Sequence, residues 1–441
     1  MEHAMSESKS PFATEPVGGL IVKFAIPCVI SLVVNALYNI VDQIFIGWGV
    51  GYLGNGATNI VFPITIITLA MAVLVGDGGA AYLSLKLGEG DMASLKKGVG
   101  NSVVMVTIAG IALLVITLVF MDPILTLFGA TDALRPYAEE YGYVIAIGLP
   151  FTMISTALNA IIRADGSPKF AMFSMVLGAV INTIFDPIFI FALDMGVRGA
   201  AIATVMGQVA SFVVSVLYLP RFKTCHLDRS AFRLHLRVCK NVLSLGVSSF
   251  ITQIAITIVM TLFNNLLAIY GAESIYGAEI PLTAMGIVMK VNQIMLSILV
   301  GIAVGAQPVI GFNYGCKNFD RVKKAFELAI FAAEVIAVIA FLIFEFAVMC
   351  FRIFLMLCPL NGFQTVTAIY LQAIGKPVKS AIVTLARQIV FLIPAALILP
   401  QMMGVTGVLW SGPVADALAF ILALSFVLYD RKQLKKVPVQ E

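Results

Sequence analysis

Charged residues are scarce in this sequence. Asp, Glu, Lys and Arg make up 12% of the 441 residues, whereas apolar residues make up 60%, and the mean hydropathy is +1.00. A soluble domain carries about 25% charged residues. The shortage excludes an ordinary soluble protein. The lack of alternating apolar and polar residues over segments of ~10 residues excludes a transmembrane β-barrel.

Motifs of enzymes and channels are also absent. The chain has no HExxH, GxSxG or Walker motif, its three histidines lie outside the apolar segments, and no filter loop of the TVGYG type occurs. The stretch "GDGGAA" around Asp77 resembles a phosphate-binding loop only superficially, because it lies inside an apolar helix and follows no strand. These absences argue against an enzyme and a nucleotide-binding protein.

Long apolar segments dominate what is present. A hydrocarbon core of about 30 Å is crossed by roughly 20 helical residues. Twelve segments are predicted to do so: 19–46, 56–87, 94–118, 132–163, 168–192, 199–219, 241–270, 281–312, 321–344, 346–374, 378–400 and 404–428. No cleavable signal peptide is expected, since the first 18 residues are polar and acidic. The sequence therefore predicts an all-α polytopic membrane protein.

Lys and Arg gather in alternate connections between these segments. If the N-terminus is cytoplasmic, the outer connections keep only Arg135 and Arg198. Both termini are therefore predicted to be cytoplasmic. The net charge of +4 reflects this bias and does not indicate nucleic-acid binding. The cysteines predict no disulfide framework, because they fall either in or beside spans or on the reducing side: Cys28, Cys350, Cys358, Cys225, Cys239 and Cys316.

The chain contains an internal repeat. "GDGGAAYLSLKLG" at 76–88 matches "AVGAQPVIGFNYG" at 303–315, with an offset of 227 residues (303 − 76), and "SLKKGV" at 94–99 matches "RVKKAF" at 321–326 with the same offset. "MGVRG" at 195–199 matches "MGVTG" at 403–407. Each half holds an even number of spans, so both halves start on the same side. We predict two parallel six-helix bundles around a central cavity, the design of an alternating-access transporter.

The repeat predicts the domain organisation. A cytoplasmic tail at 1–18 precedes a first lobe at 19–219, a basic cytoplasmic linker at 220–240, a second lobe at 241–428 and a tail at 429–441. The offset falls to 209 residues (359 − 150) between Pro150 and Pro359, so the second lobe lacks about 18 residues (227 − 209) between its third and fourth helices. Either these helices turn tightly around Phe344 to Glu345, or the chain is a shortened version of its relatives.

Two acidic residues lie inside predicted spans of the first lobe, Asp42 in "YNIVDQIFIG" and Asp186 in "NTIFDPIFI". An intramembrane carboxylate costs about 2.5–3.5 kcal/mol and is functional by default. Asn182 shares a helix face with Asp186, and Pro187 is expected to loosen the helix beside them. With Thr204 of the next span, these oxygens suit a small cation or a proton shared by the carboxylates. The alternative is that Asp186 only hydrogen-bonds a neighbouring helix.

The second lobe lacks this acidic pair. Its intramembrane ionisable residues include Arg387. Three others, Lys290, Glu334 and Asp416, could form a second polar network or, alternatively, a purely structural interhelical ion pair. Candidates for the wall of a substrate cavity are Met285, Met289 and Gln253, with ordinary helix packing as the alternative for the methionines.

The motifs "IVDQIFIG", "NTIFDPIFI", "GAQPVIGFNYG" and "LQAIGKP" resemble the multidrug and toxic compound extrusion (MATE) family over about residues 15 to 430, and its bacterial efflux pumps in particular. The resemblance implies export of cationic amphipathic drugs and dyes in exchange for Na⁺ or H⁺. It implies no other cofactor, and a monomer in the bilayer of the bacterial cytoplasmic (inner) membrane. A lipid-linked glycan flippase of the same superfamily and an ion channel are the alternatives.

The resemblance also assigns residue roles. Asp42, Asn182, Asp186 and Thr204 match the first-half cation site, where Na⁺ would bind at the two aspartates. The backbone carbonyl of Ala200 is a candidate further ligand. Asn159 and Gln43 are candidate supporting polar residues.

Overall fold

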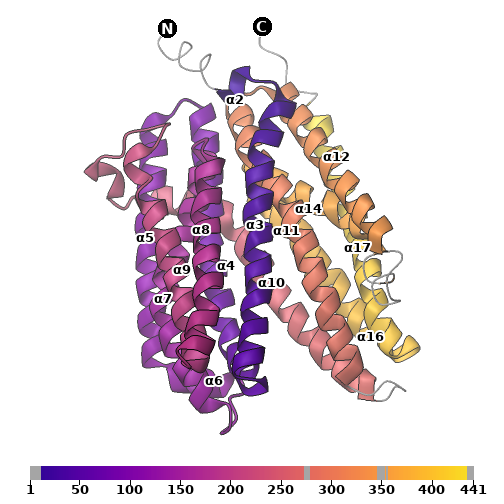
Figure 1. Cartoon of the computed structure of the whole chain (residues 1–441). Coiled ribbons are helices and arrows are strands. Elements are labelled where there is room, and N and C mark those ends of the chain that lie inside the picture. Colours follow the sequence, from indigo (N-terminus) through magenta and orange to yellow (C-terminus); the bar gives the residue numbers. More distant parts are fainter. Residues whose placement is uncertain (1–10, 273–278, 345–352, 354–355, 435–441) are drawn as a thin grey trace. The chain divides into compact units, whose positions relative to one another are not determined.

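The computed structural model describes residues 11–272, 279–344, 353 and 356–434, and every regular element within them is a helix (Figure 1). The N-terminal elements are α2 (Pro11–Thr14), α3 (Val17–Gly49), α4 (Tyr52–Gly88), α5 (Met92–Val119), α6 (Met121–Leu127), α7 (Arg135–Ala164), α8 (Pro168–Pro187), η1 (Ile188–Ala192) and α9 (Gly196–Val216). They are followed by η2 (Leu219–Arg221), η3 (Arg229–Phe232), α10 (Leu236–Ala272), α11 (Glu279–Gly315), α12 (Phe319–Phe344), α14 (Cys358–Ala373), α15 (Pro377–Leu385), η4 (Ala386–Leu392), α16 (Ile393–Met403) and α17 (Val405–Leu434).

The helices confirm the predicted all-α polytopic membrane protein. Ten of the described helical segments are long and apolar enough to cross a membrane. The predicted span 321–344 appears as α12, and the described part of span 346–374 is the shorter α14. The turn or deletion expected just after Phe344 lies outside the described residues.

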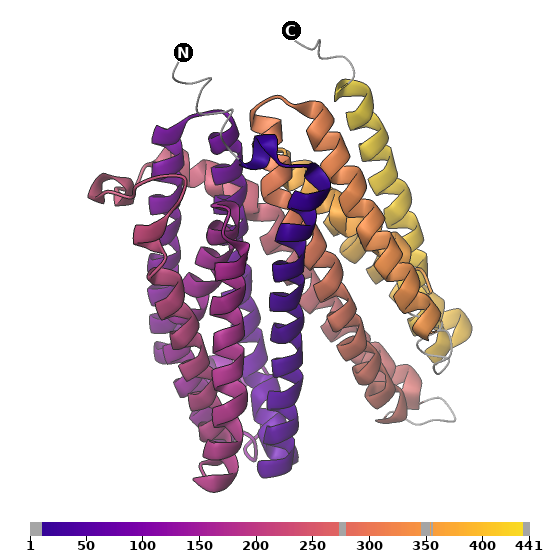
Figure 2. The same cartoon turned by 45° about the horizontal axis from the view of Figure 1, so that its top comes forward.

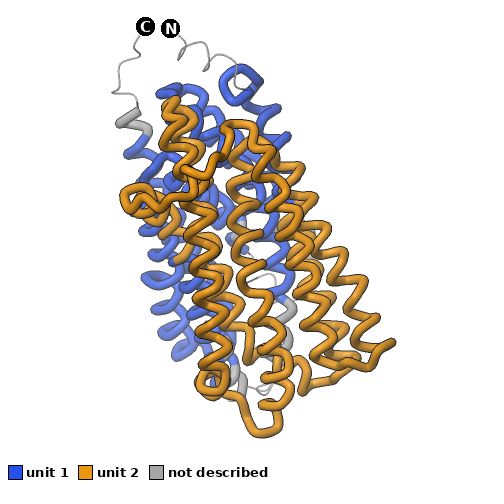
Figure 3. The backbone as a smooth tube through the Cα atoms, turned by 90° about the vertical axis from the view of Figure 1, so that its left-hand side faces the viewer, with its two compact units in different colours: residues 1–29, 251–441 blue, residues 30–250 orange. Residues whose placement is uncertain are grey.

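The chain divides into two compact units (Figure 3). Unit 2 comprises residues 30–250, and unit 1 comprises residues 1–29 and 251–441. Both boundaries fall inside long helices, α3 and α10, so each of these helices contributes to both units. The lobe boundaries predicted from the repeat remain a prediction.

The core of unit 2 is built around α7. Val75, Leu83 and Leu158 belong to one cluster of buried apolar side chains, and a second cluster joins α4, α6 and α7. Small residues bring the helices close: a Cβ added at Gly76 would lie 2.7 Å from the Cα of Ala157. Such small-residue contacts suit helices in a bilayer, where packing rather than water drives association.

Two buried polar residues fasten the linker between α9 and α10 to unit 2. Asp165, which is 2% exposed, accepts hydrogen bonds from the Tyr218 hydroxyl at 2.6 Å and from the backbone N–H of Lys223 at 2.8 Å. Asn101, which is fully buried, donates to the backbone carbonyl of Arg233 at 3.0 Å. The linker is therefore tied down near both of its ends.

Unit 1 has its own core, in which α10, α11, α16 and α17 pack around Phe263 and Val408. Two lysines at the start of α15 share one buried aspartate: Lys376 and Lys379 lie 3.1 and 3.2 Å from Asp430 of α17.

Candidate functional site

Asp186 lies at the end of α8, where the helix changes its hydrogen-bonding pattern. Its side chain is fully buried, at 0% exposed. The next residue, Pro187, has no N–H to donate to the carbonyl of Thr183. The chain then continues as the π-helical turn η1. This confirms that the helix is loosened beside the carboxylate, and π-turns are frequent at functional sites.

Asn182 links Asp186 to Thr204 of α9. Its Nδ2 donates to Asp186 Oδ1 at 3.2 Å and to Thr204 Oγ1 at 3.1 Å. The Asp42 carboxyl group, from α3, lies within hydrogen-bonding range of both Asp186 and Asn182. The structure therefore brings together all four side chains of the predicted set.

Several oxygens of this cluster are buried without a hydrogen-bond partner. They are Asp42 Oδ1, Asp186 Oδ2 and Asn182 Oδ1, and the nearby Asn159 Oδ1 and Gln208 Oε1 share this condition. A buried acceptor without a donor costs about 1–3 kcal/mol. Acceptors gathered in this way are satisfied by a cation, a proton or water. Carboxylate and amide oxygens are hard ligands, which fits Na⁺.

Only two carboxylates belong to this cluster. Within the described residues, no group of three or more His, Cys, Asp or Glu side chains is arranged to hold a metal ion. The donor set thus fits a monovalent cation or a proton better than a transition metal, which prefers imidazole or thiolate ligands.

A cavity of about 90 Å³ lies next to the carboxyl cluster, within unit 2. It is lined by Asn35, Tyr38, Thr152, Ser155, Thr156, Asn159, Met175, Gly178, Ala179, Asn182, Thr204, Gly207, Gln208 and Ser211. Its volume holds several water molecules but is below the ~300 Å³ at which drug-sized pockets begin. The cavity therefore suits a hydrated ion rather than a drug.

Two glycines set the spacing of α8 and α9, which lie side by side (Figure 2). A Cβ added at Gly207 would lie 2.4 Å from the carbonyl oxygen of Gly178 and 3.4 Å from Asn182 Cβ. Because neither glycine has a side chain, the two backbones can approach closely enough for Asn182 to reach Thr204.

The supporting residues take different positions. Asn159 of α7 is 2% exposed and lines the cavity. Ala200 is fully buried and packs with Ile46 and Ile190, while Gln43 is partly exposed beside Asp42. The ligand role of the Ala200 carbonyl and the supporting role of Gln43 remain predictions.

Tyr38 and Gln208 line the same cavity but are missing from the predicted set. A local signal was available for both. Tyr38 precedes Asp42 by four residues and Gln208 follows Thr204 by four, so each shares a helix face with a predicted residue.

The candidates of the second half do not form one group. Asp416 accepts a hydrogen bond from Arg387 Nε at 2.7 Å, Glu334 accepts one from the backbone of Phe363, and Lys290 is exposed. Among the described residues, no hydrogen bond or ion pair joins Lys290, Glu334 and Asp416 to one another. The Arg387–Asp416 contact matches the alternative of an interhelical ion pair.

The three candidates for a substrate-cavity wall lie on α10 and α11. Met285 is 3% exposed and belongs to the core of unit 1, and Met289 packs against that core. This placement favours ordinary packing for the two methionines. Gln253 is partly exposed on α10.

The helical fold and an acidic, oxygen-rich cluster inside the membrane-spanning helices define a polytopic membrane transporter. A family model described as MatE matches residues 27–188 and 249–398. The chain therefore belongs to the MatE family, the MATE family that its motifs resemble.

Curated relatives match nearly the whole chain. The multidrug export protein MepA of Staphylococcus aureus (strain N315) is 25% identical and covers 96% of each chain. The protein of the same name from Staphylococcus haemolyticus (strain JCSC1435) is 26% identical and covers 92% of each.

Solved structures confirm the fold. A crystal structure of MATE in complex with MaD3S superposes with a TM-score of 0.90 at 24% identity, covering 97% of this chain and 99% of that one. An outward-facing multidrug resistance MATE family transporter of the MOP superfamily gives 0.89 at 24% identity, covering 97% and 98%.

Proposed function

We propose that the protein exports small cationic amphipathic drugs and takes up Na⁺ or H⁺ in exchange. The observation that carries the proposal is the Asp42–Asp186 carboxyl pair, whose Oδ1 and Oδ2 atoms, respectively, are buried without a partner. Two carboxylates this close repel one another unless they hold a proton or a cation. The pair is therefore the natural place for a coupling ion.

The cavity beside the pair supports a route for this ion. It begins at Asn182 and Thr204 and continues toward Gln208 and Ser211 along α9. In the topology proposed from the Lys and Arg distribution, this direction leads toward the cytoplasm. An ion released from the carboxyl pair would thus meet polar side chains on its way inward.

The energetics of exchange are consistent with the proposal. Expelling one positive charge against 100 mV, interior negative, costs about 2.3 kcal/mol. The entry of one Na⁺ or H⁺ cancels this electrical cost, and a tenfold gradient of the ion adds about 1.4 kcal/mol of driving force.

The substrate class rests on relatives and on charge. Both relatives above carry the name multidrug export protein. A lipid-linked glycan flippase would need basic groups for a pyrophosphate, whereas no Lys or Arg lines the described cavity and its neighbours Asp42 and Asp186 are acidic. The acidic residues inside the spans therefore argue against the flippase, and the name of the relatives supports a drug as the substrate.

The deciding experiment is dye efflux measured in everted membrane vesicles under separately imposed Na⁺ and H⁺ gradients. We expect one gradient to drive transport in the wild type and neither to drive it in Asp186→Asn. If Na⁺ is the coupling ion, it should also raise the melting temperature of the wild type but not of Asp186→Asn. Efflux of Asp186→Asn at the wild-type rate would contradict the proposal. A current through the protein without dye movement would indicate a channel.

The proposed orientation has its own test. Ser230→Cys, in the linker, should react with an impermeant thiol reagent only from the cytoplasmic side. Native Cys225 should not interfere, because burial raises the pKa of its thiol to about 11 and the side chain is 8% exposed. Cys239 and Cys316 would be replaced by Ser. Labelling from outside intact cells would contradict the topology.

A further inference from the structure

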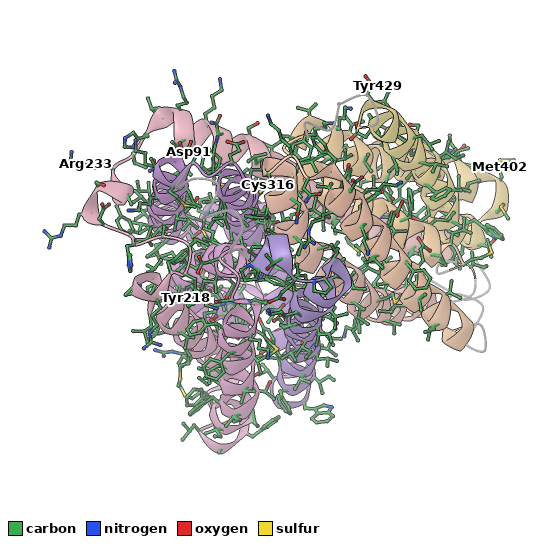
Figure 4. The ribbon with its side chains drawn as sticks, turned by 90° about the horizontal axis from the view of Figure 1, so that it is seen from above. Asp91, Tyr218, Arg233, Cys316, Met402 and Tyr429 are labelled. Atoms are coloured by element: carbon green, nitrogen blue, oxygen red, sulfur yellow. The ribbon has the colours of Figure 1, made fainter. Side chains whose placement is uncertain are left out.

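A second hollow in unit 2 lies where the linker crosses the start of α5. It is lined by Met92, Ala93, Lys96, Lys97, Ser230 and Ala231 and has a volume of about 320 Å³. We call it the linker groove. Figure 4 looks down on this end of the structure and labels Asp91, just before α5, and Arg233, just after η3. The groove shares no residue with the cavity beside Asp186.

The wall that the linker contributes is held firmly against α5. Asn101 Nδ2 donates to the backbone carbonyl of Ala231 at 3.2 Å, and Asn101 Oδ1 accepts from the backbone N–H of His235 at 2.7 Å. The backbone lies so close that a Cβ added at Gly100 would be 2.2 Å from the Ala231 carbonyl oxygen. The groove is thus built by buried contacts and is not a gap beside a loose loop.

The charge of the groove is positive. Lys96 and Lys97 line it, and the exposed Arg229 and Arg233 lie on the adjoining linker. The one carboxylate on this part of the linker, Asp228, is engaged locally: it accepts from the Ser230 hydroxyl at 2.7 Å and from the Ala231 N–H at 3.1 Å.

The acidic residue at the start of α5 is likewise engaged. Asp91 accepts from the Ser94 N–H at 3.0 Å and lies 3.9 Å from Lys86. Both aspartates still attract the lysines, Asp228 acting on Lys96 and Asp91 on Lys97. Among the described residues, however, no ion pair joins either lysine to a carboxylate, so both can contact an anion from outside the protein.

The groove lies at the level where the membrane ends. The candidate span Met92–Val119 begins at a residue that lines the groove, and the linker that forms the other wall lies between the candidate spans Gly196–Arg221 and Leu236–Leu267. Next to it, Leu234 is 52% and Leu236 is 88% exposed, and Arg233 and Arg237 flank these leucines in the sequence. Exposed apolar side chains next to basic ones are typical of a surface that contacts both lipid tails and headgroups.

We propose that the linker groove binds the phosphate of an anionic phospholipid headgroup from the cytoplasmic leaflet. Lys96 and Lys97 neutralise the phosphate, and Leu234 and Leu236 contact the acyl chains. The volume suits a headgroup, since it is at the lower end of the range for small-molecule sites. The inference rests on the orientation proposed above but not on the coupling ion or the exported substrate.

The internal repeat supplies a matched control. Lys96 and Lys97 correspond to Lys323 and Lys324 of α12 at the offset of 227 residues (303 − 76). The α12 lysines are exposed, and they do not line the linker groove. Neutralising either pair removes the same charge from the same position of a helix, but only one change affects the groove.

The test uses the purified full-length protein in detergent with phosphatidylcholine, titrated with phosphatidylglycerol. Retained lipid is counted by native mass spectrometry and the melting temperature is followed in parallel. A lysine near an anionic surface contributes about fivefold in binding. The Lys96→Gln/Lys97→Gln variant should therefore need more than about tenfold more phosphatidylglycerol for half-saturation. Lys96→Arg/Lys97→Arg and Lys323→Gln/Lys324→Gln should behave as wild type.

Three results would overturn the proposal. Equal losses of phosphatidylglycerol binding in the two Gln variants would indicate an effect of general surface charge. If the wild type does not prefer phosphatidylglycerol over phosphatidylcholine, an anionic phospholipid is not the ligand. Saturation by inorganic phosphate at the same concentration would indicate a site for free phosphate. Lipid binding and dye efflux are measured separately. If the protein binds lipid through the groove but shows no ion-driven efflux, the proposed function is contradicted and this inference is not.

Discussion

The two halves of the repeat treat buried charge in opposite ways. In unit 1, Arg387 of η4 donates to Asp416 of α17 at 2.7 Å, and the side chains are 16% and 5% exposed. In unit 2, Asp42 and Asp186 lie within hydrogen-bonding range of each other, and no Lys or Arg of the described residues forms an ion pair with either. The Arg387–Asp416 pair of one half is neutralised internally, whereas the Asp42–Asp186 pair of the other half has no described cationic side chain as a partner.

The residues behind this difference occupy equivalent places in the repeat. Asp416 corresponds to Gln208 at an offset of 208 residues (403 − 195), and Arg387 corresponds to Gly178 at an offset of 209 (359 − 150). Gln208 and Gly178 line the cavity of unit 2. The ion pair of unit 1 therefore stands where unit 2 keeps polar, solvent-sized space. The two halves have kept equivalent helices but carry different side chains at this one location.

The largest expected effect comes from removing the carboxylates of unit 2. Asp42→Asn and Asp186→Asn should each reduce gradient-driven efflux to background. The double variant should be no worse, because residues that act as a unit are not additive. Folding should be retained or improved, since Asn is nearly isosteric and removes a charge that is costly in the bilayer. Additive partial losses would show that the two aspartates work separately.

Breaking the ion pair of unit 1 should give the reverse result: a loss of stability with unchanged ion dependence. Arg387→Ala leaves Asp416 buried without its partner, which costs about 3–5 kcal/mol for a buried pair. The measurement is thermal unfolding of the purified protein, and Arg387→Met/Asp416→Leu should recover much of the loss. Ion dependence of any remaining efflux should be that of the wild type. A change in the coupling ion or its stoichiometry would place this pair in the transport mechanism.

A smaller effect is expected where the helices cross. Gly207→Ala would place a Cβ 2.4 Å from the Gly178 carbonyl oxygen, which forces α8 and α9 apart and should cost about 1–3 kcal/mol of stability. It should also weaken ion dependence, because Asn182 would no longer reach Thr204 at 3.1 Å. The control is Ala415→Gly, at the position that corresponds to Gly207 in the repeat, which should leave ion dependence unchanged. Equal effects of the two changes would show that the close spacing of α8 and α9 does not determine ion dependence.

The sequence predicted the cluster of Asp42, Asn182, Asp186 and Thr204 because charge inside a bilayer is rare and costly. Asp42 and Asp186 stand out in apolar segments. Asn182 and Asp186 are four residues apart, which predicts that they share one helix face, as the hydrogen bond of 3.2 Å confirms. The twelve apolar segments and the repeat were sufficient for the fold class, because the length of a span is fixed by the membrane.

The partners of charged residues on different helices could not be predicted in the same way. Asp416 was grouped with Lys290 and Glu334, whereas the structure pairs it with Arg387. Local patterns give the face of a helix but not the rotation of that face toward a helix distant in sequence. Gln208, which lines the cavity, was missed for a different reason: it shares a helix face with Thr204, but neutral polar residues are common in such helices and do not stand out by composition.

The smallest expected effect concerns the neutral ligands. Asn182→Ala removes one amide that reaches both Asp186 and Thr204, and Thr204→Ala removes one hydroxyl. Each loss of a single neutral contact is worth about 1–1.5 kcal/mol, or roughly tenfold in ion affinity. Both variants should therefore keep maximal efflux and need about tenfold more Na⁺ or H⁺ to reach half of it. The matched control is Ser411→Ala in α17, a buried hydroxyl of unit 1 that donates to the Val408 carbonyl at 2.6 Å, which should leave the ion requirement unchanged. A similar rise in all three variants would mean that buried hydroxyl and amide groups act on helix packing. In that case the contrast between the two halves would rest on the carboxylates alone.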